Sequence, residues 1–137
     1  MKATIIPIES IADERGNLVV GEFPKNLPFA PVRFFLVGEV PPSVVRGNHA
    51  HKSNHQFLLC ISGRIKVRVN NGHEWQEFDL YSNTAGLLIP ALHWAEQEYL
   101  TPGSQLLVLA SEQYSASGYI NSLAEFNSHL ATIRNSK

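Results

Sequence analysis

The chain has 137 residues, of which 17% are charged, and its formal net charge is −1. This length suits one domain with a core of its own, and the near-neutral charge excludes a global electrostatic attraction to nucleic acid or to an anionic membrane. The single cysteine, Cys60, excludes an internal disulfide and fits a reducing cytoplasm.

The chain starts with the segment Met1–Pro7, which lacks the apolar core of a signal peptide, and no apolar run reaches the length of a membrane span. We therefore expect a soluble, cytoplasmic protein. Within this start, the apolar segment Thr4–Ile8 predicts a strand. We expect it to join the sheet of a second copy of the chain, which would make a homodimer. The alternative is that this strand completes its own barrel.

Short candidate strands separated by turns fill the middle of the chain. The clearest lies at 64–69, where Ile65, Val67 and Val69 alternate with basic residues between two turn signals. Further candidates are Leu18–Glu22, Val32–Val37, Phe57–Ile61, Gln76–Leu80, Gly86–Ile89 and Gln105–Ala110. Many short strands at such regular spacing predict an all-β sandwich or barrel.

The hydrophobic period changes only near the C-terminus. There Leu123, Phe126, Leu130 and Ile133 recur at helical spacing, and Ser122 begins a capping-box pattern. This predicts a short helix over about 122–133. The sequence shows no internal repeat or linker, so we expect residues 1–137 to form a single domain.

The motif with the most chemical meaning is a pair of histidines. His49 and His51 are two residues apart on an extended segment, so their side chains point to the same side. Imidazoles titrate near neutral pH, which suits general acid–base chemistry, and Arg46 can hold an anion beside them. Such a pair can also bind a transition metal, or be only a polar patch near a turn. The pair alone leaves all three interpretations open.

The spacing around the pair resembles the cupin motifs. Gln56 and then Gly63 follow the histidines as in the first cupin motif, and the segment 86–93, ending at His93, resembles a shortened second motif. The resemblance implies a cupin double-stranded β-helix, which is a jelly roll, with the site inside the barrel. Metal-binding cupins carry a glutamate where this chain has neutral Gln56. We therefore expect no metal and no other cofactor.

A closer resemblance covers the chain from Asp13 to Phe126. The segments 13–18, 26–29, 33–35 and 46–52, followed by 109–111 and 119–120, resemble the dTDP-4-keto-6-deoxyglucose 3,4-ketoisomerases, which are WxcM-like sugar ketoisomerases of the cupin superfamily. The resemblance implies an isomerase that moves the carbonyl of a dTDP-linked sugar from C4 to C3 through an enediol. It also implies a place in the synthesis of dTDP-3-amino-3,6-dideoxyhexoses, which serve lipopolysaccharide.

The same resemblance implies roles for particular residues. His49 and His51 would transfer the protons. The expected substrate-binding residues are Arg15, Arg33, Arg46, Phe35, Gln56, His93 and Trp94. Guanidinium groups match phosphate oxygens, so the arginines would bind the diphosphate or orient the sugar. Phe35 or Trp94, with Phe34 as a further candidate, would stack on thymine.

Three other functions remain open at this point. The chain could be a dTDP-sugar epimerase or another sugar isomerase, since a resemblance supports a chemistry better than a substrate. It could be a metal-dependent cupin enzyme. It could also be a sugar-binding cupin without catalytic activity.

Overall fold

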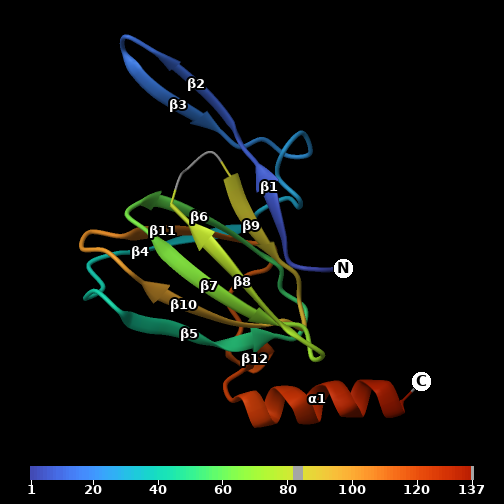
Figure 1. Ribbon diagram of the computed structural model, residues 1–137. Coiled ribbons are helices and arrows are strands. Elements are labelled where there is room, and N and C mark those ends of the chain that lie inside the picture. The colour runs from blue at the N-terminus through green and yellow to red at the C-terminus, as the bar shows by residue number, and fades with distance from the viewer. Residues whose placement is uncertain (82–84, 137) are drawn as a thin grey trace.

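The computed structural model describes residues 1–81 and 85–136, and its body consists of two antiparallel five-stranded sheets that face each other (Figure 1). The first sheet has the spatial order β1 (Thr4–Pro7), β9 (Ala85–Ile89), β6 (Gln56–Ser62), β11 (Gln105–Ala110) and β4 (Arg33–Val37). The second has the order β12 (Tyr119–Ile120), β5 (Val44–His51), β10 (Trp94–Tyr99), β7 (Ile65–Asn70) and β8 (Trp75–Leu80). The expected all-β jelly roll with a short C-terminal helix is confirmed.

The apolar core lies between the two sheets. Ile65 and Val67 of β7 are fully buried and belong to one cluster with Leu58 and Leu87 of the opposite sheet. The alternation at 64–69 is therefore confirmed, because the apolar residues point inward. On the outer face, Arg68 pairs with carboxylates of the two neighbouring strands.

Strand β10 was not expected from the sequence. Its inward residues are Ala95, Gln97 and Tyr99, and it carries the outward Glu96 and Glu98 between them. An inward glutamine interrupts the apolar period on which strand prediction depends. Polar residues point inward here because this strand lines the cavity described below.

The first strand pairs within its own chain. Residues Thr4 to Pro7 of β1 lie antiparallel to β9, with Thr4 opposite Leu88 and Pro7 opposite Ala85. In the single chain this strand therefore completes its own sheet, which is the alternative given above, and its joining a second copy stays a prediction. The apolar pattern predicts a strand that needs an edge, but it cannot say which edge, and the edge of β9 lies within reach of the same chain.

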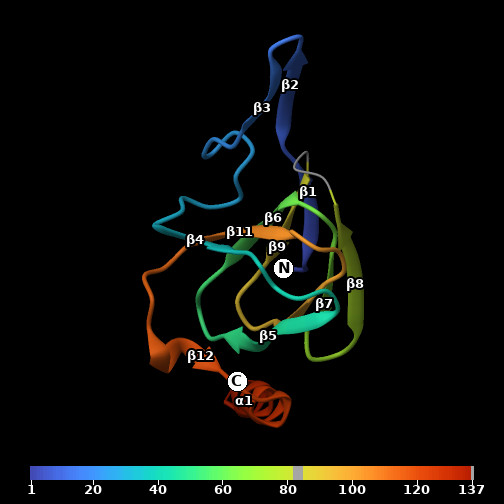
Figure 2. The ribbon, with the colours of Figure 1, turned by 90° about the vertical axis from the view of Figure 1, so that its left-hand side faces the viewer.

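A hairpin, here called the arm, stands away from the two sheets (Figure 1). It consists of β2 (Glu9–Asp13) and β3 (Gly16–Val20), which pair only with each other. Ile11 and Leu18 are about half exposed on it. Figure 2 shows the arm at the opposite end of the molecule from the helix.

The helix α1 (Leu123–Asn135) covers β12 and the end of β5, after a short 3-10 turn at Ala116–Gly118. The Ser122 hydroxyl accepts a hydrogen bond from the backbone N–H of Glu125 at 3.1 Å, as the capping pattern predicted. Phe126 and Leu130 pack against Trp94 in a separate apolar cluster. No helix in the described ranges is long and apolar enough to cross a membrane.

Candidate active site

A β-bulge in β5 brings the arginine and the histidines of the motif to one side. Two successive residues of β10 pair with His49 and Gly47, so Asn48 has no partner in the register. Gly47 (φ 91°) and Asn48 (φ 55°) adopt left-handed backbone conformations, which glycine and asparagine tolerate best. Regular alternation would put Arg46 and His49 on opposite faces. Because of the extra residue, both face the interior of the barrel.

A cavity of about 70 Å³ lies between the two sheets. Its polar side chains are Arg46, His49, Gln56, Gln97 and Tyr99. The remaining walls are apolar side chains and the backbone of Gly47. This volume equals that of about two water molecules. The cavity therefore has room for a reacting group of a sugar and not for a nucleotide.

His51 lies further along β5, where it borders a smaller hollow together with Arg33 and Tyr119. The ring centres of His49 and His51 are 5.0 Å apart. The Tyr119 ring lies 5.0 Å from His49 and 4.4 Å from His51, because β12 pairs Tyr119 directly with His51. The three rings form one continuous group that joins the cavity to the smaller hollow.

Burial favours the neutral form of both imidazoles. It lowers the pKa of His51 to about 4, and the charges of His49 and Arg33 act in the same direction. Burial also lowers the pKa of His49, against a smaller opposing effect of the Gly47 backbone. The buried Nε2 of His51 has no hydrogen-bond partner among the described residues. At neutral pH the pair can therefore accept protons.

Arg33 reaches the same group from β4. Its guanidinium carbon lies 5.4 Å from the ring centre of Phe35 and 5.6 Å from that of Tyr114, within the range of cation–π contacts. Its buried Nε has no hydrogen-bond partner in the described part of the chain. The position suits a donor to phosphate or sugar oxygens beside His51.

The structure brings six of the predicted site residues together, namely Arg33, Phe35, Arg46, His49, His51 and Gln56. It does not bring Arg15 to them. The Arg15 side chain is 85% exposed at the tip of the arm, where it forms an ion pair with Asp13 at 2.7 Å. Sequence order gives no measure of how far a hairpin projects, so this separation could not be foreseen.

The other predicted contacts also lie elsewhere. Trp94 is only 4% exposed, packs 6.3 Å from the Phe126 ring and donates from Nε1 to Glu96, so the expectation that it stacks on thymine was wrong. Phe34 is exposed on the outer face of its sheet. His93 is buried, with Nδ1 3.0 Å from the Ala91 carbonyl oxygen, and borders neither the cavity nor the smaller hollow.

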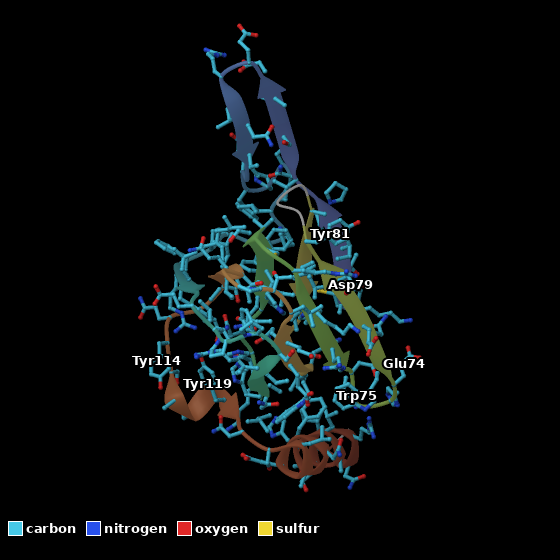
Figure 3. The ribbon with its side chains drawn as sticks, turned by 60° about the vertical axis from the view of Figure 1, so that its left-hand side comes forward. Glu74, Trp75, Asp79, Tyr81, Tyr114 and Tyr119 are labelled. Carbon is cyan, nitrogen blue, oxygen red and sulfur yellow. The ribbon has the colours of Figure 1, made fainter. Side chains whose placement is uncertain are left out.

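The sequence did not predict several residues that the structure places at the site. Tyr114 and Tyr119 lie beside each other on the segment between β11 and α1, with ring centres 5.7 Å apart (Figure 3). The only sequence signal was the position of Tyr119 in a segment that resembles the ketoisomerases. Gln97 and Tyr99 were missed because β10 itself was missed.

The described residues contain no group of three or more histidine, cysteine, aspartate or glutamate side chains arranged to hold a metal ion. Beside His49, the cavity offers the neutral amide of Gln56. An amide is a poorer ligand than a carboxylate for a divalent transition metal. The donor set therefore suits proton transfer better than metal binding.

Comparison with known proteins agrees with this geometry. The chain matches the family model "FdtA: WxcM-like, C-terminal" over residues 1–131. It is 33% identical to the TDP-4-oxo-6-deoxy-alpha-D-glucose-3,4-oxoisomerase of Aneurinibacillus thermoaerophilus, over 97% of this chain and 96% of that one.

Solved structures give the same result. A 3,4-ketoisomerase from Helicobacter canadensis superposes with a TM-score of 0.91 at 31% identity, covering 96% of this chain and 98% of that chain. The sugar 3,4-ketoisomerase QdtA from Thermoanaerobacterium thermosaccharolyticum, in complex with TDP, has a TM-score of 0.91 at 32% identity and 96% coverage of both chains. A dTDP-4-dehydrorhamnose 3,5-epimerase from Bacillus anthracis shares only the fold, at 18% identity, a TM-score of 0.78, and coverage of 87% of this chain and 77% of that one.

Proposed function

The chain belongs to the FdtA family of WxcM-like proteins, and we propose that it is a nucleotide-sugar 3,4-ketoisomerase that converts dTDP-4-keto-6-deoxyglucose into its 3-keto isomer. The observation that carries this proposal is a pair of imidazoles 5.0 Å apart and held neutral by burial, of which His49 lines the cavity that also contains Arg46. The named activities of the similar proteins support the same reaction.

The reaction needs a base that takes the proton from C3 and an acid that gives a proton to C4. One imidazole removes the proton from C3, the electron pair of that bond forms the C3–C4 double bond, and the carbonyl electron pair moves to O4, which takes up a proton to give an enediol. A proton then enters at C4, while O3 loses its hydroxyl proton and becomes the carbonyl oxygen. The two rings, 5.0 Å apart, can serve neighbouring carbon atoms in this way.

The nucleotide must lie outside the cavity, because the cavity has a volume of only about 70 Å³. We assign Arg33 and Arg46 to the diphosphate or to the sugar hydroxyl groups, since both border the histidine group and guanidinium forks suit phosphate oxygens. Tyr114 is 66% exposed beside Arg33 and offers an aromatic face on which the thymine of the nucleotide can stack.

We propose that the protein acts as a homodimer. A two-stranded hairpin is marginally stable in water on its own, and the arm exposes Ile11 and Leu18. Phe34 and Leu36 add exposed apolar surface on the outer face of β4. A second copy that covers these surfaces would stabilise the arm, and a substrate role for Arg15 would then be exerted in the partner's site.

Light scattering at micromolar concentration tests this assembly. We expect twice the 15.2 kDa mass of one chain, and we expect Leu18→Asp together with Phe34→Asp to return the protein to a single-chain mass. A wild-type mass near that of one chain would refute the dimer.

The proposed product suits a place in deoxysugar synthesis. A carbonyl at C3 is the group that an amino-transfer reaction needs, so the product would feed the synthesis of dTDP-3-amino-3,6-dideoxyhexoses for lipopolysaccharide. We place the protein in the cytoplasm, where its free and buried Cys60 would stay reduced.

The deciding experiment is incubation with dTDP-4-keto-6-deoxyglucose in D₂O, followed by NMR of the sugar ring. We expect the carbonyl to move to C3 and deuterium to appear at C4. A 3,5-epimerase would instead introduce deuterium at C3 and C5 and leave the carbonyl at C4. A carbonyl that stays at C4 with no exchange at any carbon would refute the proposed isomerase and leave a sugar-binding function.

A further inference from the structure

The side chain of Tyr99 has a hydroxyl group that the fold leaves without a partner. Tyr99 ends β10 and is 0% exposed. Its hydroxyl oxygen is buried and makes no hydrogen bond to any described residue. Buried tyrosine hydroxyls usually have a partner, because burying a hydroxyl without one is unfavourable. The group therefore needs an explanation other than packing.

The surroundings of Tyr99 indicate what the partner is. The residue lines the same cavity as His49, Gln56 and Arg46. Phe35 and other apolar residues line much of the rest, and Phe35 has no polar atom to offer. Tyr99 is thus part of the wall of the cavity that His49 also lines.

The electrostatics keep this hydroxyl protonated. Burial raises the pKa of Tyr99 to about 12, and the charge of Arg46 opposes that rise only in part. At neutral pH the phenol is therefore a hydrogen-bond donor, and the low local dielectric around a buried group strengthens such a donor. A phenylalanine would retain most of the packing without the cost of the buried hydroxyl.

We propose that Tyr99 is a catalytic residue whose hydroxyl donates a hydrogen bond to the substrate oxygen that becomes negatively charged during enolisation. This inference rests on the proposed ketoisomerase function. When a histidine takes the C3 proton, the C3–H electron pair forms the C3–C4 double bond and the carbonyl electron pair moves to O4. Tyr99 keeps its proton and stabilises that oxygen by hydrogen bonding. No electron acceptor is needed, because substrate and product are isomers.

The test is Tyr99→Phe, with Tyr81→Phe as the matched control. Tyr81 is 70% exposed after β8 and lies far from Tyr119 (Figure 3). We expect kcat of Tyr99→Phe to fall about 10²-fold, the typical effect of removing one donor to a developing oxyanion, with a small change in KM. We expect its melting temperature to equal or exceed that of the wild type, and Tyr81→Phe to retain wild-type kcat.

A purely structural role would give a different result. It predicts a lower melting temperature for Tyr99→Phe, with turnover per folded molecule unchanged. If Tyr99→Phe keeps a wild-type kcat while the wild type isomerises its substrate, the inference about Tyr99 is overturned and the proposed function stands.

Binding measurements distinguish a failure of the inference about Tyr99 from a failure of the proposed function. We expect Tyr99→Phe to bind dTDP as the wild type does and to bind dTDP-glucose several-fold more weakly, because the hydroxyl meets the sugar and not the nucleotide. If the wild type isomerises nothing, the proposed function fails. Calorimetric measurement of dTDP and dTDP-glucose binding then tests the Tyr99 contact by itself. A selective loss of dTDP-glucose affinity then supports the sugar contact, and unchanged affinity for both ligands refutes it.

Discussion

Replacing His51 with asparagine should remove one of the two proton acceptors that we propose for the site. His51 is 6% exposed, and its Nε2 has no hydrogen-bond partner among the residues that the structure describes. Asparagine keeps a polar side chain there but cannot take up a proton near neutral pH. Loss of a positioned acid–base group typically costs about 10²–10⁴-fold in rate. We expect kcat to fall by that factor and dTDP affinity to change little.

The pH dependence follows from the low pKa of His51, which burial brings to about 4. At pH 6 a group with this pKa is about 1% protonated, whereas an exposed histidine would be about three-quarters protonated. The wild-type kcat/KM should therefore show no loss from protonation of His51 between pH 8 and 5.5. The unfolded chain binds this proton near pH 6.5 and the folded chain only near pH 4. The free energy of unfolding should thus decrease by about 3 kcal/mol from this residue as the pH falls through that window.

The assay is the initial rate of isomerisation followed by NMR, combined with chemical unfolding at each pH. His73→Asn is the matched control, since His73 is exposed in the turn before β8 and should leave both profiles unchanged. A decrease in activity with a midpoint near pH 6.5 that is absent in His51→Asn would refute the buried neutral base. Wild-type turnover in His51→Asn would refute its catalytic role.

Three further changes test other parts of the structure. Gly47→Ala should lower kcat at least tenfold and the free energy of unfolding by about 1–2 kcal/mol, as measured by turnover and thermal unfolding. The reason is that Gly47 has φ 91° and that an added Cβ would lie 2.7 Å from Oε1 of Gln97. Phe126→Ala should lower the free energy of unfolding by about 3–5 kcal/mol, since Phe126 of α1 is fully buried against Trp94. A difference of less than about 1 kcal/mol in chemical unfolding would contradict this packing. Treatment with a strong chelator should leave the isomerisation rate unchanged, because hydrogen-bond donors can stabilise an enediol; full loss restored by one divalent metal would overturn this.

Much of the fold follows from local patterns in the sequence. Alternation of apolar and basic residues predicted β7, and a helical period with a serine cap predicted α1, because these periods reflect which side of an element is buried. The spacing of His49 and His51 placed both rings on one side, and the ring contact agrees. Prediction was weakest for β10, where the inward Gln97 and Tyr99 serve the cavity and break the apolar pattern.

The sequence by itself determined the all-β class, the C-terminal helix and the histidine pair, since each depends on residues close together in the chain. Only the tertiary structure decided that Arg46 shares a face with His49, because that depends on a bulge set by pairing with β10. It also decided that Trp94 lies beneath α1, that Arg15 stands at the tip of the arm, and that the hydroxyl of Tyr99 lies buried at the cavity. Such positions result from packing between residues far apart in the chain, and no local spacing encodes them.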